Sequence, residues 1–334
     1  MTRPTEHAPI VEVSNASVAF ANEGVTTSAV HDVSFSVREG EIFGIVGESG
    51  CGKSTLAQLL MGLLPESARV SGSLRYQGEE LLGQSPEQWR RLRGNRMSLI
   101  SQDPRAALDA VTPIGHQVAE TIRAHRKVSR REARSLAITA LAETGIAQAE
   151  ERYGDPPHRF SGGMCQRVVI AAALANQPDL LIADEPTTAL DVTIQAQILA
   201  LLRGLRERSN MTVILITHDM GVIAQMCDRV GVMYAGELVE VADVREIFAK
   251  PGHPYTEALF GAIPAAGRRG RPLRVIPGQV PDLSKPQDGC RFKERCAYRI
   301  AQCDQAPALS EISPSQAAAC WKRGNYRPGG DRRD

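Results

Sequence analysis

The chain has 334 residues, 43% of them hydrophobic and 23% charged, which fits a globular protein with one large domain and an appendage or with two medium-sized domains. Its net charge is +1, which excludes a global basic field of the kind that attracts nucleic acid. The longest hydrophobic run, residues 168–175, is far shorter than the ~20 residues that span a bilayer, and the N-terminus lacks the apolar core of a signal peptide. We therefore expect an uncleaved cytoplasmic protein.

Short β-strands are predicted near the start of the chain, over residues 10–13, 17–20 and 33–37, because apolar and polar residues alternate there. Phe20 ends the second of these strands. Its ring could stack on an adenine base beside a phosphate site, or it could be an ordinary aromatic residue of a sheet. Both interpretations stay open.

A phosphate-binding loop is predicted directly after the apolar run 42–46. The loop reads Gly47-Glu48-Ser49-Gly50-Cys51-Gly52-Lys53-Ser54-Thr55 and fits G-x-x-x-x-G-K-[ST], with a helix predicted over residues 56–64. Glycines let the backbone curl so that successive N–H groups point at phosphate oxygens, and the helix adds its positive N-terminal end. Lys53 can reach the β- and γ-phosphates, and the Ser54 hydroxyl can hold Mg²⁺.

The middle of the chain adds two polar segments. A strand over residues 97–100 ends on Ser101-Gln102-Asp103-Pro104, and residues from about 105 to 176 are predicted to be mostly helical. Within that stretch, Phe160-Ser161-Gly162-Gly163-Met164 leads straight into a helix. Free N–H groups at a helix N-terminus form a second anion site, although a Ser-Gly-Gly loop is a weak signal by itself.

Acidic side chains follow the next predicted strand. Residues 180–183 are apolar and are followed by Asp184 and Glu185, which indicates a buried parallel strand with carboxylates at its C-terminal edge. Asp184 would hold Mg²⁺ opposite Ser54, and Glu185 could polarise the attacking water. The strand over 212–216 ends near His218, for which a γ-phosphate contact is favoured over a plain edge position. Two strands, 230–234 and 238–241, follow, and no internal repeat is visible.

Together these motifs resemble the ATP-binding subunit of an ABC transporter over residues from about 10 to 250. The matching motifs are the Walker A loop 47–55, the Q-loop Gln102, the signature loop 160–164, Walker B with Asp184 and Glu185, the D-loop Ala189-Leu190-Asp191 and the switch His218. The resemblance implies an α/β fold, a P-loop NTPase core of ABC type with an antiparallel β subdomain and an inserted helical subdomain over about 105–176. It also implies two domains, residues 1–250 and a C-terminal extension over 251–334.

The resemblance implies how the chain works. Two such subunits dimerise head to tail and hydrolyse ATP, with Ser161, Gly162 and Gly163 touching the partner's nucleotide and Gln102 joining Ser54 and Asp184 at Mg²⁺. Phe160 and Met164 depart from the usual Leu-Ser-Gly-Gly-Gln of the family. Because the three central residues are intact, we expect a competent site with altered tuning.

The resemblance narrows to the dipeptide and oligopeptide importers, a branch that includes nickel importers. It rests on residues 101–104, 107–109 and 114–117 and on the tail segments 252–259 and 276–283. The branch implies a second, related but different ATPase chain, two transmembrane permease subunits and, indirectly, an extracytoplasmic solute-binding protein. It places the chain on the cytoplasmic face of the plasma membrane without a nucleic-acid partner. Dipeptide, oligopeptide and nickel cannot be separated on these residues.

Four of the seven cysteines gather near the C-terminus, and we call Cys290, Cys296, Cys303 and Cys320 the cysteine set. Their C-x5-C-x6-C-x16-C spacing lacks the C-x2-C pairs of structural zinc sites and ferredoxins. Unliganded thiols, a tetrahedral zinc ion and a 4Fe–4S cluster compete as interpretations. The resemblance to the peptide-importer branch favours the cluster, in a structural or redox-sensing role. The nearby basic residues Arg291, Lys293, Arg295 and Arg299 would suit its negative charge.

Two other classes of protein are less consistent with these motifs. A soluble ABC-type ATPase acting on DNA or the ribosome would need a long coiled-coil insertion or a second nucleotide core, and the chain has neither. A catalytically silent regulatory subunit would not need Lys53, Asp184, Glu185 and His218, all of which are present.

Overall fold

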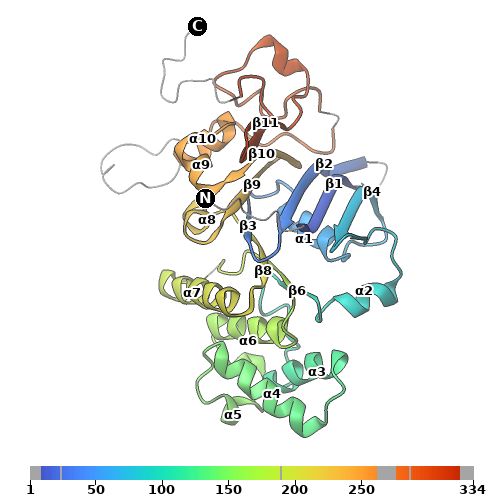
Figure 1. Ribbon diagram of the computed structural model, residues 1–334, viewed down its shortest axis with the longest axis vertical. Coiled ribbons are helices and arrows are strands. Elements are labelled where there is room, and N and C mark those ends of the chain that lie inside the picture. Colours follow the sequence, from blue (N-terminus) through green and yellow to red (C-terminus); the bar gives the residue numbers. More distant parts are fainter. Residues whose placement is uncertain (1–8, 23–24, 189, 262–275, 286, 324–334) are drawn as a thin grey trace, which may run out of the picture. The chain divides into compact units, whose positions relative to one another are not determined.

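The structure of the chain is a computed structural model (Figure 1), which describes residues 9–22, 25–188, 190–261, 276–285 and 287–323. The chain divides into two compact units: residues 1–82 together with residues 217–334 form the first, and residues 83–216 form the second. No helix among the described residues is long and apolar enough to cross a bilayer.

The first unit contains two arrays of strands. Its strands are β1 (Pro9–Asn22), β2 (Val25–Arg38), β3 (Ile42–Val46), β4 (Ala68–Tyr76), β5 (Glu79–Glu80), β9 (Arg229–Tyr234), β10 (Glu237–Asp243), β11 (Ser310–Ser313) and β12 (Gln316–Ala318). Its helices are α1 (Lys53–Leu60), α8 (Met220–Met226), α9 (Val244–Ala249), α10 (Pro254–Gly261) and the 3-10 helix η2 (Ala301–Asp304). The antiparallel sheet has the order β2-β1-β4-β5, and the other array runs β11-β12-β10-β9-β3, in which β3 and β9 are parallel.

The two predicted strands 10–13 and 17–20 form one strand, β1, with a bulge between them. Asn15 adopts a left-handed φ of 49°, and the register against β2 shifts between Val13 and Ala16. The Asn15 side-chain amide donates to the Asp32 carboxylate at 2.8 Å, and Asp32 is also left-handed at φ 49°. The polar residues that read as a break between strands therefore bend a continuous strand.

The second unit is built on parallel strands. It contains α2 (Pro86–Leu92), β6 (Met97–Ile100), α3 (Ile114–His125), α4 (Arg130–Glu143), α5 (Ala149–Arg152), the 3-10 helix η1 (Pro157–Arg159), α6 (Gly162–Leu174), β7 (Leu180–Asp184), α7 (Val192–Ser209) and β8 (Thr212–Thr217). The strands pair in the order β8-β7-β6, and β7 is buried throughout. Parallel pairing brings the C-terminal ends of all three strands to one edge. Helices α3, α4, α5 and α6 gather into one group (Figure 1).

Regular helix in the predicted stretch 105–176 begins only at Ile114. Before it, the Asp103 carboxylate accepts the N–H groups of Arg105 and Ala106, at 2.9 and 3.2 Å. The Asp109 carboxylate accepts those of Val111 and Thr112 in the same way. Such local bonds from Asp to nearby backbone N–H groups compete with helix formation, so the chain turns here instead of coiling.

The buried carboxylate of Glu240 on β10 joins three parts of the first unit. Glu240 is fully buried and accepts the N–H groups of Gly252 at 2.7 Å and His253 at 2.9 Å, just before α10. It also accepts the side-chain amide of Gln316 on β12 at 2.7 Å. Residues of the C-terminal extension are thereby fixed to β10, which also pairs with β12.

Glu240→Ala should destabilise the protein, because three buried donors lose their acceptor together. We expect the free energy of unfolding to fall by roughly 2 kcal/mol, which lowers the melting temperature by roughly 5 °C. Differential scanning calorimetry measures this change. Glu311→Ala is the matched control, since Glu311 is exposed on β11 and its loss should change the melting temperature little. Equal melting temperatures for the two variants would contradict this role of Glu240.

Candidate nucleotide-binding site

The phosphate loop, residues 47–55, curls between β3 and α1 and needs its glycines for two steric reasons. A Cβ at Gly47 would lie 2.2 Å from the carbonyl oxygen of Met233 on β9. Gly52 caps α1 in a left-handed conformation, φ 101°, and a Cβ there would lie 2.3 Å from the carbonyl oxygen of Ala29 on β2. Only glycine fits such close approaches of backbone to backbone. The neighbouring strands therefore shape the loop.

Lys53 holds the loop closed around its own ammonium group. The side chain is buried, and Nζ donates to the carbonyl oxygens of Gly47 at 2.9 Å and Glu48 at 3.0 Å. On the outer side of the loop, the Gly236 N–H donates to the Cys51 carbonyl oxygen at 3.0 Å. Gly236 follows Ala235 in the turn between β9 and β10, where both residues have positive φ. The cation is thus held by backbone oxygens of its own loop.

The other predicted residues of the loop differ in their exposure. Ser54 is exposed in the first turn of α1, Ser49 and Gly50 are exposed at the tip, and Thr55 is half-buried. Phe20 is half-buried near the end of β1, opposite Thr27 on β2. Its adenine contact stays a prediction.

In the second unit, Gln102 and Glu185 meet at the C-terminal edge of the parallel strands. The Gln102 side-chain amide donates to the Glu185 carboxylate at 3.1 Å, and the Thr188 hydroxyl donates to the same carboxylate oxygen at 2.7 Å. Glu185 has a left-handed φ of 48°, and its N–H donates to the Ile216 carbonyl oxygen on β8 at 2.9 Å. A strained backbone at such a position is typical of a functional residue. Asp184 is the buried last residue of β7.

His218 follows β8 in the first unit and is exposed. Directly after it, the Asp219 N–H donates to the Thr217 hydroxyl at 3.0 Å, and the Asp219 carboxylate accepts the Gly221 N–H at 2.7 Å to cap α8. In the D-loop, Ala189 lies outside the described residues, whereas Asp191 caps α7 by accepting the Ile194 N–H at 2.9 Å.

The signature loop forms the start of α6. Ser161 is the exposed N-cap residue, and its hydroxyl accepts the Met164 N–H at 3.4 Å. A Cβ at Gly163 would lie 2.8 Å from the Ile194 side chain, whereas one at Gly162 would meet open space. Phe160 is buried, and the Arg152 guanidinium lies 5.6 Å from its ring centroid. The first departure from the usual motif is therefore an apolar anchor beneath the loop.

The cysteine set surrounds one small cavity, together with His253 and Phe292 among other residues. All four are free thiols, the Cys290 N–H donates to the Cys303 carbonyl oxygen at 2.9 Å, and the Cys296 sulfur accepts the Tyr298 N–H at 3.4 Å. Burial raises the pKa of Cys290 to about 12 and that of Cys296 to about 11. These two groups are therefore protonated at neutral pH. No three His, Cys, Asp or Glu side chains among the described residues are grouped so that they could hold a metal ion.

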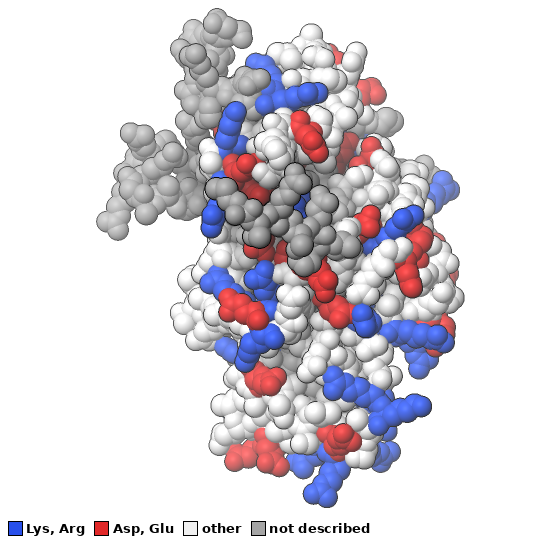
Figure 2. All heavy atoms as spheres, viewed as in Figure 1, with Lys and Arg blue, Asp and Glu red and all other residues white. Residues whose placement is uncertain are grey.

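The four basic residues near the cysteine set are paired with carboxylates. Each one forms an ion pair: Arg291 with Glu237 at 2.8 Å, Lys293 with Asp304 at 3.0 Å, Arg295 with Glu48 at 2.8 Å and Arg299 with Glu294 at 2.9 Å. On the face shown in Figure 2, Lys and Arg side chains are likewise interspersed with Asp and Glu.

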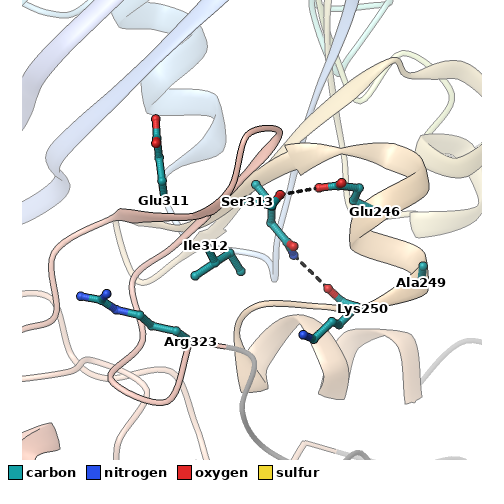
Figure 3. A pocket seen from close by; sticks show the side chains of 8 residues that line it. Glu246, Ala249, Lys250, Glu311, Ile312, Ser313 and Arg323 are labelled. Carbon is teal, nitrogen blue, oxygen red and sulfur yellow. Dashed lines mark hydrogen bonds between the residues drawn. The ribbon is translucent and has the colours of Figure 1, made fainter.

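A larger hollow lies where β11 and β12 meet α9 (Figure 3), lined by Glu246, Lys250, Ser313 and Gln316 among others. The Ser313 hydroxyl donates to the Glu246 carboxylate at 2.8 Å, and the Gln316 amide donates to the Lys250 carbonyl oxygen at 2.9 Å. These side chains are used to join the extension to α9, so this hollow is a structural junction.

Comparison with known proteins identifies the family. Residues 30–188 match the ABC transporter family model, and residues 239–303 match the model for the C-terminal region of oligopeptide/dipeptide transporters. The chain is 49% identical to the probable peptide ABC transporter ATP-binding protein y4tR of Sinorhizobium fredii, over 94% of this chain and 95% of that protein. The chain belongs to the ATP-binding proteins of ABC transporters.

Other members of the family agree with this assignment. The dipeptide transport ATP-binding protein DppD of Bacillus subtilis is 46% identical, over 93% of this chain and 94% of that protein. The oligopeptide transport ATP-binding protein OppD of Salmonella typhimurium is 43% identical, over 94% and 93%. A dimeric ATP-binding cassette, MJ0796 bound to ADP and Pi, superimposes with a TM-score of 0.64 at 26% identity and covers 70% of this chain and 99% of that one. The predicted family, the ABC-type fold and the ATPase activity are confirmed.

Sequence reasoning missed several groups of this ABC ATP-binding protein. The Tyr255 hydroxyl accepts the Glu48 N–H at 3.0 Å, and Arg295 pairs with the Glu48 carboxylate. Thr188 holds Glu185. The sequence around Tyr255 indicates only the peptide branch, and Arg295 stands out in the sequence only by its charge. Nothing local in either segment points to the phosphate loop.

Gly52→Ala should weaken nucleotide binding, because the added methyl collides with the Ala29 carbonyl and displaces the loop. We expect at least about tenfold lower affinity for a fluorescent ATP analogue. Gly78→Ala is the matched control: Gly78 is also left-handed, at φ 81°, but its Cβ would meet open space in the turn after β4. It should lower stability slightly and leave nucleotide affinity unchanged. Equal affinities for both variants would show that the close approach at Gly52 does not shape the site.

Proposed function

We propose that this ABC ATP-binding protein powers the import of dipeptides or oligopeptides through a membrane transporter. The observation that carries the proposal is the pairing of the ABC match with the C-terminal region of oligopeptide/dipeptide transporters in one chain. The relatives described above are named for peptide, dipeptide and oligopeptide transport. Nickel, the alternative cargo of the same branch, has no comparable support.

For ATP hydrolysis we assign roles to the residues at the two strand edges. Lys53 would bind the β- and γ-phosphates, and the exposed Ser54 hydroxyl with Asp184 and Gln102 would hold Mg²⁺, whose charge balances that of the phosphates. All three present oxygen ligands, which suit this hard cation. Glu185 would accept a proton from the attacking water. Its carboxylate is oriented for this by Gln102 and Thr188. His218 would contact the γ-phosphate.

The assembly that we propose contains more than one chain. Ser161, Gly162 and Gly163 lie at the N-terminus of α6, an anion-binding position, and would serve the ATP of a second, related ATPase subunit. The protein would act at the cytoplasmic face of the membrane with two transmembrane permease subunits and, indirectly, an extracytoplasmic solute-binding protein. Closure on ATP and opening after hydrolysis would drive the permeases, because ATP binds the two states with different affinity.

We also propose that the chain is organised as a nucleotide-binding domain over residues 1–250, with a helical subdomain over about 105–176, and an extension over 251–334. The helices α3 to α6 support the subdomain. The bonds of Glu240 to residues 252, 253 and 316 support an extension that is fixed to the core and does not swing freely.

For the extension we propose a 4Fe–4S cluster bound by the cysteine set. Support comes from four free thiols around one cavity and from the N–H donor to the Cys296 sulfur. A tetrahedral zinc ion is the alternative occupant of the same four thiols. Binding of the cluster would displace the thiol protons.

Glu185→Gln should abolish ATP hydrolysis and peptide uptake while ATP still binds, because the variant keeps the shape of the side chain and loses the base. We expect turnover to fall by at least about a hundredfold. For the measurement, the chain is co-expressed with its permease and ATPase partners, and the purified complex is placed in proteoliposomes. A radiolabelled dipeptide or oligopeptide is the transported substrate.

Glu207→Gln, an exposed position on α7, is the control and should leave both rates unchanged. Persisting turnover in Glu185→Gln would refute the assignment of the base. ATP-dependent accumulation of Ni²⁺ without peptide uptake by the wild type would refute the proposed cargo.

The chain purified without oxygen should carry about four iron atoms and show a broad brown absorbance, if the cysteine set holds a 4Fe–4S cluster. Cys290→Ser and Cys320→Ser should lower the iron content and bleach the absorbance. Cys165→Ser is the control, because Cys165 is buried on α6 outside the cysteine set. Stoichiometric zinc, or the same iron content in all variants, would overturn the proposal.

A further inference from the structure

Every N–H donor of the Arg295 side chain has an acceptor, which is unusual for an ion pair at a protein surface. Its five N–H donors reach five acceptors: Nε donates to Pro277 O at 2.9 Å, Nη1 to Glu48 Oε2 at 2.8 Å and Tyr234 Oη at 3.3 Å, and Nη2 to Glu48 Oε1 at 3.1 Å and Ile276 O at 3.5 Å. Only 7% of the side chain is exposed. A bidentate, partly buried pair of this kind is stronger than an exposed pair and sets geometry.

The carboxylate that Arg295 holds belongs to the second residue of the phosphate loop. The backbone of the same residue, Glu48, donates its N–H to the hydroxyl of Tyr255, which is fully buried. The rings of Tyr234, Tyr255 and Phe292 pack together, with centroids 4.6 Å apart for the two tyrosines and 5.5 Å apart for Tyr255 and Phe292. Both the side chain and the backbone of Glu48 are therefore fixed by residues far along the chain, most of them in the extension.

Glu48 places a negative charge in a loop whose chemistry is to bind phosphate. An unbalanced carboxylate there would repel the nucleotide, more strongly because the Glu48 side chain is only 26% exposed. The guanidinium of Arg295 cancels this charge through its two hydrogen bonds to the carboxylate.

We propose that Arg295 is a positioning residue of the ATP site, which orients Glu48 and cancels its charge so that the affinity of the phosphate loop for ATP depends on the C-terminal extension. The inference rests on the proposed function, because it takes the loop at residues 47–55 as the site that binds ATP. It adds a residue outside the recognised motifs to that site. It also gives the extension a part in nucleotide binding, beside any part in holding a cluster.

The test is equilibrium binding of a fluorescent ATP analogue to the purified full-length chain, with a melting temperature for every variant. Arg295→Ala should bind at least about tenfold more weakly than the wild type. Glu48→Gln combined with Arg295→Ala should recover most of that loss, because the repelling charge is gone. A merely structural role predicts no recovery. Arg299→Ala is the matched control, since Arg299 forms ion pairs with Glu294 and Asp304 within the extension. It should bind like the wild type.

The Lys53→Ala variant distinguishes a failure of the Arg295 proposal from a failure of the proposed function. If Lys53→Ala abolishes binding while Arg295→Ala binds within about twofold of the wild type, Arg295 has no role in the site and the proposed function stands. If the wild type does not bind the analogue, the proposed function itself fails. Should Arg295→Ala not fold, Glu48→Gln alone carries the test. It should bind at least as tightly as the wild type, and a tenfold loss would overturn the charge-balancing role.

Discussion

The curl of the phosphate loop around the Lys53 ammonium is the constraint on which the first unit depends. The lysine is held by carbonyl oxygens of its own loop, so the loop must stay tightly wound. Tight winding brings its backbone against β9 and β2, where Gly47 and Gly52 leave no room for a Cβ. The turn between β9 and β10 then supports the loop from outside through the Gly236 N–H. The close packing of this loop against β9 and β2 thus requires glycine at both positions.

Residues distant in sequence complete this support. Tyr255 and Arg295 reach Glu48 across separations of 207 and 247 residues. Arg291 donates to the Ala235 carbonyl, next to the glycine that holds the loop. The first-unit segments before residue 82 and after residue 217 therefore fold as one body. The C-terminal extension, which is an appendage in the order of the sequence, therefore contributes the Tyr255 hydroxyl and the Arg295 charge to the phosphate loop.

The pattern of apolar and polar residues was sufficient to predict the elements that depend on residues close together in the sequence. The strands β3, β6, β7 and β8, and the loops that follow them, were predicted within about two residues, because buried parallel strands read as short apolar runs. The bulge at Asn15 and the late start of α3 were missed, because they depend on side chains that bond nearby backbone. The carboxylate partners of the basic residues near the cysteine set were missed for a different reason. Composition counts the cations, but only the fold shows the carboxylates that pair with them.

The second unit shows how one side chain can serve two partners. An amide has a donor and an acceptor, and Gln102 uses its nitrogen on the Glu185 carboxylate. Its oxygen is chemically suited to the cation that we assign to Ser54 and Asp184. Glu185, meanwhile, keeps a left-handed backbone, a strain of about 1–3 kcal/mol that persists only when its surroundings enforce it. Two backbone bonds constrain it: the Glu185 N–H donates to the Ile216 carbonyl oxygen, and the Thr188 N–H donates to the Glu185 carbonyl oxygen at 3.1 Å. Two side-chain donors therefore fix the orientation of the carboxylate that we propose as the base.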